Sequence, residues 1–179
     1  MMTHHIFTFR AELTGDAAAI EHLLDHCFGP GRHVLTAYRL REGVDPIAEL
    51  GLVAFEEDRL IGSVRFWPIL IGASETPALL LGPLAVDPAR RNLGAGIALM
   101  RRGLELATAA GHRLVILVGD APYYARAGFK PVPHGQITLS GPYDPDRLLA
   151  FECVAGALAQ AEGEVGKALS DPRGTRQGP

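Results

Sequence analysis

Apolar residues recur at helical spacing in two parts of the chain. Between Asp16 and Phe28 the apolar positions stand three or four residues apart, and Asp16 is placed to cap a helix through its side chain. From Gly94 to Ala110 the same spacing continues in a composition rich in strong helix formers, and Gly111 follows where a C-terminal cap belongs. The sequence therefore predicts an amphipathic helix in each segment.

Short apolar runs bounded by polar or turn-forming residues predict the strands. Two of these runs are separated only by the charged residues 56–59, which indicates an antiparallel hairpin. A mostly apolar run that ends at Val86 is too short for a typical helix, so it is interpreted as a buried strand. The expected strands are Thr8–Leu13, Glu49–Phe55, Leu60–Leu70, Leu79–Val86, Leu114–Val118, Gln136–Ser140 and Leu148–Val154.

Two further segments are predicted to be short or irregular helices. After the break at Gly29–Gly31, the residues up to Glu42 have the composition of a second, less regular helix. Later in the chain Asp120 stands where an N-cap belongs and Pro122 falls within the first turn, which predicts a short helix ended by Gly128. Strands and helices thus alternate along most of the chain, which favours the α/β (α+β) class.

Length and composition are those of an ordinary globular protein. With 179 residues, of which 47% are hydrophobic and 21% charged, the chain can bury one sizeable core. We therefore expect a single domain over residues 1–168 and a flexible tail over residues 169–179. The sequence contains neither the apolar core of a signal peptide at its start nor an apolar stretch of roughly 18 residues, so we expect no membrane partner and a cytoplasmic location.

Charge and potential metal ligands disfavour several function classes. The net charge of -3 gives no overall attraction to nucleic acid, which is therefore disfavoured as a partner. The two cysteines lack the pair spacing of a zinc or redox site, and the histidines lack the further ligands that a metal needs, so we predict no metal. Binding of an anion would have to come from a local feature of the chain.

The junction between the strand ending at Val86 and the helix after it is such a feature. It contains Gly94 and Gly96, and a glycine-containing turn at a helix start binds anions because its N–H groups have no partner within the helix. The helix dipole contributes roughly 0.3 to 1 kcal/mol, whereas each N–H bond to a charged acceptor contributes roughly 1.5 to 3 kcal/mol. A side chain at either glycine would keep anion oxygens from the amides, and Arg90 and Arg91 add positive charge.

Two widespread phosphate loops do not fit this junction. The chain has no G-x-x-x-x-G-K-[ST] segment, and Gly94–Leu99 lacks the third glycine of the dinucleotide-binding fingerprint. A lone G-x-G would usually mean only that a helix packs closely on a strand. The residues around Gly94 and Gly96 extend the G-x-G into a longer pattern, and the longer pattern changes this interpretation.

The extended pattern resembles the signature of a known family. Val86-x-Pro88-x-x-Arg91-x-x-Gly94-x-Gly96 matches in full the V-x-P-x-x-[RQ]-x-x-G-x-[GA] pattern of the GNAT superfamily of N-acetyltransferases. In that family the pattern binds acetyl-CoA. The resemblance therefore implies acetyl-CoA as the acetyl-donor cosubstrate, held by its diphosphate at this loop and helix start.

A second, shorter match follows at residues 124–129. The segment Tyr124-Ala125-Arg126-Ala127-Gly128-Phe129 resembles the Y-x-x-x-G-F that ends the cofactor-binding region of the same family. The resemblance implies a mixed, mostly antiparallel central sheet, flanked by helices and splayed at its central strands. It also implies that the cofactor is bound by Leu84, Ala85, Val86, Arg91, Asn92, Leu93, Gly94, Ala95 and Gly96.

A proline in the strand before the loop independently supports the splay. In the family this strand separates from its neighbour, and the pantetheine arm of CoA fills the gap. Here the strand contains Gly82-Pro83, and proline cannot donate a hydrogen bond to a strand ladder. We therefore expect interrupted pairing at Pro83, although a plain bulge without a ligand would produce it as well.

The resemblance implies direct attack of an acceptor amine on the thioester, without an acetyl-enzyme. By resemblance Tyr124 is the catalytic residue and donates a hydrogen bond to the departing thiolate, while the adjacent Tyr123 fits the pattern less well. A backbone N–H between Leu84 and Val86 would stabilise the developing oxyanion.

The general base and the acceptor contacts stay open. Asp120 and Glu56 are candidate bases, but Asp120 also suits a helix cap and Glu56 a turn. Arg65 and Trp67 alternate onto one strand face, where they would meet an acidic or aromatic acceptor, or else form a solvated arginine beside a half-buried tryptophan.

Together these patterns predict an N-acetyltransferase that acts on a primary amine of a small molecule or peptide. The alternative is a non-catalytic CoA-binding or sensor protein of the same fold, which would bind the cofactor without releasing thiol. Acetylation of charged tRNA is disfavoured by the net charge of -3. The sequence leaves open the identity of the acceptor and a possible homodimer.

Overall fold

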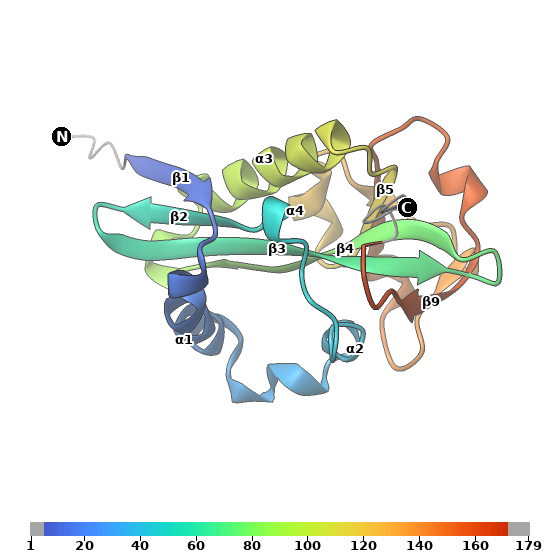
Figure 1. The fold of residues 1–179 in the computed structure, drawn as a ribbon, viewed down its shortest axis with the longest axis horizontal. Coiled ribbons are helices and arrows are strands. Elements are labelled where there is room, and N and C mark those ends of the chain that lie inside the picture. Colours follow the sequence, from blue (N-terminus) through green and yellow to red (C-terminus); the bar gives the residue numbers. More distant parts are fainter. Residues whose placement is uncertain (1–5, 172–179) are drawn as a thin grey trace, which may run out of the picture.

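A long antiparallel hairpin occupies the centre of the sheet in the computed structural model, which describes residues 6–171 (Figure 1). The hairpin consists of β3 (Arg59–Ile71) and β4 (Thr76–Val86). Beyond β3 the sheet continues antiparallel through β2 (Leu52–Glu56) and β1 (Phe7–Ala11). The hairpin predicted around residues 56–59 is therefore confirmed.

On the other side of β4 the sheet changes direction. β5 (Leu114–Val118) runs parallel to β4, and β8 (Leu148–Glu152) and the short β6 (Lys130–Pro131) then continue antiparallel. β9 (Gly163–Lys167) pairs antiparallel with the end of β3 and parallel with β7 (Ile137–Thr138). The predicted mixed, mostly antiparallel sheet is thereby confirmed.

Helices cover both faces of this sheet. α1 (Ala17–Phe28) and the single-turn α2 (Thr36–Arg39) lie on one face, and α3 (Ala95–Ala109) lies on the other (Figure 1). The helical spacing of apolar residues explains this arrangement, since each long helix turns its apolar stripe to the sheet. The residues buried on α1 are Ile20, Leu23 and Leu24, and those on α3 include Leu99, Met100, Leu104 and Ala107.

The remaining helices are short. α4 (Ala121–Ala125) follows β5 and is the short helix expected after Asp120. Single turns of 3-10 helix occur at Thr14–Asp16, Pro30–Val34, Ala48–Leu50, Pro88–Arg90, Pro145–Arg147 and Leu158–Gln160. None of the helices within residues 6–171 combines the length and the apolar character needed to cross a lipid bilayer.

The sheet is splayed between β4 and β5. Their pairing comprises only Leu79 with Val115 and Leu80 with Ile116, whereas β4 continues to Val86. On its other edge β4 keeps pairing with β3, interrupted by a register shift between Val64 and Phe66 that leaves one extra residue in β4 around Gly82–Pro83. The interruption expected at Pro83 is therefore confirmed, and so is the splay.

Several predicted boundaries need correction. The first strand ends at Ala11 rather than Leu13, the segment up to Glu42 forms only short turns of helix, and the strand expected over Gln136–Ser140 reduces to β7. The sequence did not predict β6 or β9. Most of the predicted tail, residues 172–179, lies outside the described residues.

The predicted side-chain cap of α1 is wrong. The Asp16 carboxylate accepts hydrogen bonds from the Leu13 N–H and from the Arg10 guanidinium, and it makes no capping bond to α1. The Arg10 guanidinium lowers the pKa of Asp16 to about 2. Asp16 therefore ties the helix start to β1 instead of satisfying the first N–H groups of the helix.

Candidate active site

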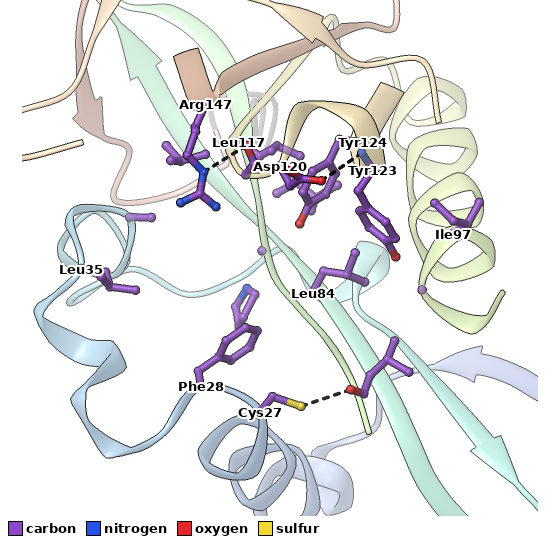
Figure 2. Close-up of a pocket in the computed structure, with 18 of the residues that line it drawn as sticks. Cys27, Phe28, Leu35, Leu84, Ile97, Leu117, Asp120, Tyr123, Tyr124 and Arg147 are labelled. Atoms are coloured by element: carbon purple, nitrogen blue, oxygen red, sulfur yellow. Dashed lines mark hydrogen bonds between the residues drawn. The ribbon is translucent and has the colours of Figure 1, made fainter. Parts of the chain in front are cut away.

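A cavity of about 780 Å³ opens where β4 and β5 separate. Residues Leu81–Leu84 and Val86 of β4 contribute to its lining, together with the start of α3, α4, the α1–α2 segment and the loop before β8 (Figure 2). Most of the predicted site residues meet here. The predicted residues in the lining are Leu84, Val86, Arg91, Asn92, Gly94, Ala95, Gly96 and Tyr124.

The loop before α3 has the backbone of an anion site. Asn92 and Gly94 both adopt left-handed conformations, with φ of 64° and 93°. The Ala98 N–H donates to Gly94 O at 3.0 Å, so the amides of the preceding first turn have no partner within the helix. A Cβ on Gly94 would have no atom within 4 Å, and the space in front of this turn is therefore open.

Gly96 has a different role from the one the sequence suggested. A Cβ on Gly96 would clash with the Tyr123 hydroxyl and approach Val86 Cγ2 at 3.2 Å. The absence of a side chain therefore lets α3 pack closely against α4 and β4. Gly94 alone has the open surroundings that were expected of both glycines.

The two arginines of the loop also differ. Arg91 lines the cavity, and no ion pair of its guanidinium occurs within residues 6–171. Arg90 also lines the cavity, but its Nε donates to Glu56 Oε2 at 2.6 Å. This ion pair offsets the charge that Arg90 was expected to add, and it removes Glu56 from the candidate bases near the cavity.

The backbone of β4 is exposed along the splay. The Asp87 N–H donates to Ile61 O of β3 at 2.8 Å. Because backbone groups alternate in direction along a strand, the N–H and C=O groups of Leu84 and Val86 point away from β3, toward the side where β5 has ended. Cys27, at the end of α1, donates its thiol to Val86 O at 3.3 Å (Figure 2).

Two of the predicted cofactor-binding residues lie outside the cavity lining. The Ala85 side chain is buried under α1 in a cluster with Ile20 and Leu24. Leu93 is 43% exposed, and neither residue lines the cavity. Any ligand contact by these two residues would have to come from the backbone.

Tyr124 projects from α4 into the cavity (Figure 2). Asp120 fixes the start of this helix by accepting a hydrogen bond from the Tyr123 N–H at 3.3 Å, as the sequence predicts. The Tyr124 ring packs edge-on against Phe129 and Tyr123, with centroid distances of 5.9 Å and 5.1 Å. These contacts set the direction of its hydroxyl.

The Tyr124 phenol keeps its proton at neutral pH. Burial raises its pKa to about 12, a negative charge on Tyr123 would raise it further, and the cations of Arg147 and Arg41 oppose the shift. A protonated phenol can donate a hydrogen bond to a nearby anionic acceptor, which a phenolate could not do. Tyr123, in contrast, directs its hydroxyl toward the start of α3 (Figure 2).

Arg65 and Trp67 both have polar partners within the protein. Arg65 forms a bidentate ion pair with Glu12, at 2.9 Å from Nε and 2.6 Å from Nη2, so it is not the solvated arginine considered above. Trp67 is half-buried, and its Nε1 donates to Gly82 O at 2.6 Å. This bond holds the bulged part of β4 beside the cavity.

Three residues of the lining carry no signal in the sequence: Tyr38, Arg41 and Arg147. Arg41 is 9% exposed, and its Nε and Nη1 have no hydrogen-bond partner among the residues that the structure describes. Arg147 points into the cavity from the loop before β8, with its Nε 3.4 Å from Gly119 O (Figure 2). These residues come from irregular segments, where neither periodicity nor a motif marks a site.

The charged lining of the cavity is mainly cationic. It contains Asp120 and Asp144 against the arginines Arg41, Arg90, Arg91, Arg126 and Arg147. Within residues 6–171, no group of three or more His, Cys, Asp or Glu side chains could hold a metal ion. The arrangement suits a ligand with several negative charges.

Sequence comparisons show that the chain is similar to acetyltransferases. Residues 9–132 match the acetyltransferase (GNAT) domain family. The chain is 33% identical over 132 residues to the uncharacterised N-acetyltransferase YjhQ of Escherichia coli K12, over 73% of each chain. It is also 31% identical over 134 residues to the uncharacterised N-acetyltransferase YhbS of the same organism, over 74% of this chain and 79% of YhbS.

Solved structures show the same likeness. The crystal structure of Escherichia coli YhbS in complex with CoA matches 94% of this chain and 93% of its own, with a TM-score of 0.79 and 27% identity. A GNAT family acetyltransferase from Brucella melitensis in complex with acetyl-CoA matches 92% and 97%, with a TM-score of 0.66 and 28% identity. Sequence and fold comparisons therefore agree.

Proposed function

Because the chain belongs to the GNAT acetyltransferase family, we propose that it transfers the acetyl group of acetyl-CoA to a primary amine of a small molecule or peptide by direct attack. The observation that carries the proposal is the cavity along the splay, which joins the open turn at Gly94 to the hydroxyl of Tyr124. YhbS and the Brucella protein, both similar in fold, are known in complex with CoA and acetyl-CoA.

The residues present fit the proposed cosubstrate. The amides of the first turn of α3 and the side chain of Arg91 would hold the diphosphate, in the open space in front of Gly94. The Leu84 C=O and the Val86 N–H, which have no strand partner on that side, would pair with the amide groups of the pantetheine arm. When bound, acetyl-CoA would supply an activated acetyl thioester.

Tyr124 is proposed as the hydrogen-bond donor to the departing sulfur. With a phenol pKa of about 12 and a thiol pKa near 8.5, full proton transfer to a free thiolate would be uphill by about 5 kcal/mol. Tyr124 therefore stabilises the sulfur chiefly by hydrogen bonding. The Leu84 N–H, on the same stretch of β4, is proposed to stabilise the charge that develops on the acyl oxygen.

Asp120 is proposed to accept the proton of the amine. It lines the cavity, whereas Glu56 is held by Arg90. Its single hydrogen bond within the helix start, to the Tyr123 N–H, leaves carboxylate lone pairs available for a further donor. We also infer that residues 1–168 act as one domain, since β9 pairs back onto the central strand β3.

Two measurements test this function. Calorimetry and thermal shift with acetyl-CoA should show binding, and acetyl-CoA with the right amine should release free thiol. Absence of binding to CoA and acetyl-CoA would refute the proposal. Binding without thiol release from any amine would favour the non-catalytic alternative.

A further inference from the structure

We propose that the acceptor amine carries a carboxylate, which binds Arg41 and Arg147 in the part of the cavity away from the phosphate loop. The proposal rests on the function proposed above and narrows its substrate class. It starts from Arg41, a buried cation in the lining that has no counter-ion within the described part of the chain.

Other buried or partly buried arginines on the same face of the sheet are neutralised by acidic residues. Arg32, which is 3% exposed, forms ion pairs with Glu21 and Asp25. Arg65 forms its bidentate pair with Glu12. Within residues 6–171 no carboxylate pairs with Arg41, and the nearest groups that influence its charge are Tyr38, Tyr124 and Arg65.

The surroundings of Arg41 hold its side chain in place without neutralising it. Its Cζ lies 4.7 Å from the ring centroid of Tyr38 and 5.8 Å from that of Trp67. Burial raises the pKa of Tyr38, so its phenol stays neutral and supplies no negative charge. Burial also lowers the pKa of Arg41 to about 10, which still leaves a cation at neutral pH.

Arg41 lies beside the bulge of β4 and near Tyr124. Its Nη2 lies 2.8 Å from the position that a Cβ on Gly82 would take, so the guanidinium borders the bulge at the start of the splay. Arg41 and Tyr124 are close enough for the charge of each to shift the pKa of the other. A carboxylate on the guanidinium would therefore hold its molecule next to the proposed reacting groups.

The rest of this end of the cavity agrees with an anionic, partly apolar molecule. Arg147 adds a second cation from the loop before β8 (Figure 2). The two aspartates of the lining are bound to helix starts, Asp120 by the Tyr123 N–H and Asp144 by the Asp146 N–H at 3.0 Å. Exposed apolar side chains of the α1–α2 segment also line the cavity, namely Phe28 and Leu35.

The test compares amines that differ only in the carboxylate. Each set consists of an amino acid, its carboxamide and the amine that lacks the carboxyl group. Sets with apolar, aromatic and polar side chains are assayed by thiol release. We expect kcat/KM for the acid to exceed that for both analogues roughly 10- to 100-fold, the usual effect of hydrogen bonds to charged groups. At neutral pH a larger fraction of the carboxamide than of the acid has an unprotonated amine. This difference favours the carboxamide as a substrate, so it works against the expected preference for the acid.

Arg41→Gln should remove the preference for the acid over the carboxamide, while KM for acetyl-CoA stays unchanged. Arg41→Lys should keep part of the preference, because it retains the charge but not the planar fork. Arg39→Gln is the matched control, since Arg39 lies just before Arg41 in the chain, is exposed and does not line the cavity. It should leave the preference intact.

A binding measurement separates this proposal from the proposed function. Calorimetry with N-acetyl amino acids and their carboxamides, with and without CoA, needs no turnover. Tighter binding of the acids than of the carboxamides, lost in Arg41→Gln, supports the inference. If this result comes without any thiol release, only the proposed function fails. Equal binding and equal rates for acid and carboxamide, or a preference that survives Arg41→Gln, would overturn it.

Discussion

The hydroxyl of Tyr123 packs against Gly96, where α4 meets the first turn of α3. We expect Gly96→Ala to lower the free energy of unfolding by about 1 to 3 kcal/mol, because the new methyl group overpacks this contact. Tyr123→Phe removes the hydroxyl and should restore part of that loss in the double variant. Chemical denaturation of the two single variants and the double variant measures the coupling, and strictly additive effects would refute the contact.

Gly94 should respond differently from Gly96. Gly94→Ala meets no atom but forces alanine into a left-handed conformation, which costs about 1 to 2 kcal/mol of stability. Its methyl group also enters the space proposed for the diphosphate, so we expect roughly tenfold weaker binding of CoA if one amide bond is lost. Calorimetry measures the affinity, and undiminished binding would remove this turn from the cofactor site.

Tyr124→Phe should lower kcat and leave the affinity for acetyl-CoA almost unchanged, because only the hydrogen bond to the departing sulfur is lost. Tyr123→Phe is the matched control, since its hydroxyl faces Gly96. Initial rates together with calorimetry separate the two effects. Equal kcat in Tyr124→Phe and the wild type would contradict the assigned role.

The raised pKa of Tyr124 predicts how the wild-type rate depends on pH. A phenol with its ordinary pKa of about 10 would be half ionised at about pH 10 and would lose its donor there. With a pKa of about 12 it stays protonated, so kcat should show no fall from this ionisation between about pH 8 and pH 10. A decline centred near pH 10 that disappears in Tyr124→Phe would show that the pKa is not raised.

Asp120 combines a proposed catalytic role with a helix cap, and asparagine separates the two. Because asparagine caps helices as well as aspartate does, Asp120→Asn should keep the melting temperature. It should lower kcat roughly 100-fold or more if the carboxylate accepts the amine proton. Asp144→Asn is the control, since Asp144 also lines the cavity and caps a turn. An unchanged kcat in Asp120→Asn would mean that water, and not Asp120, accepts the proton of the amine.

The parts of the site that could be predicted from the sequence are those set by neighbouring residues. The loop before α3 depends on Gly94 and on the start of a strongly periodic helix, and the direction of α4 depends on the cap at Asp120. Pro83 likewise marks the interrupted pairing of β4 within its own strand. Each of these features is decided within about ten residues, so spacing and residue type are sufficient.

The features that could not be predicted depend on contacts between distant segments. Arg90 meets Glu56 across 34 residues, which no local pattern indicates. The pairing of β9 with Ile71 of β3 likewise joins the C-terminal part of the fold to its central hairpin, so a weak strand pattern is stabilised from elsewhere. The burial of Arg41 arises in the same way, because Tyr38 and Trp67 come from different elements.

Arg41 and Arg65 provide a matched pair for testing whether Arg41 lacks a counter-ion. Replacing an uncompensated buried charge by an apolar side chain of similar length removes a desolvation penalty, so Arg41→Met should raise the free energy of unfolding by about 1 to 2 kcal/mol. Arg65→Met instead leaves Glu12 without its partner and should lower it by about 1 to 3 kcal/mol.

Chemical denaturation of the ligand-free protein measures both changes, and the slope of the transition checks that each variant unfolds in the same way. A gain in stability of Arg41→Met together with lost activity on carboxylated amines would mean that Arg41 serves binding and lowers the stability of the fold. If Arg41→Met destabilises the protein as much as Arg65→Met does, Arg41 has a compensating partner in solution, and the reason for expecting an anionic acceptor disappears.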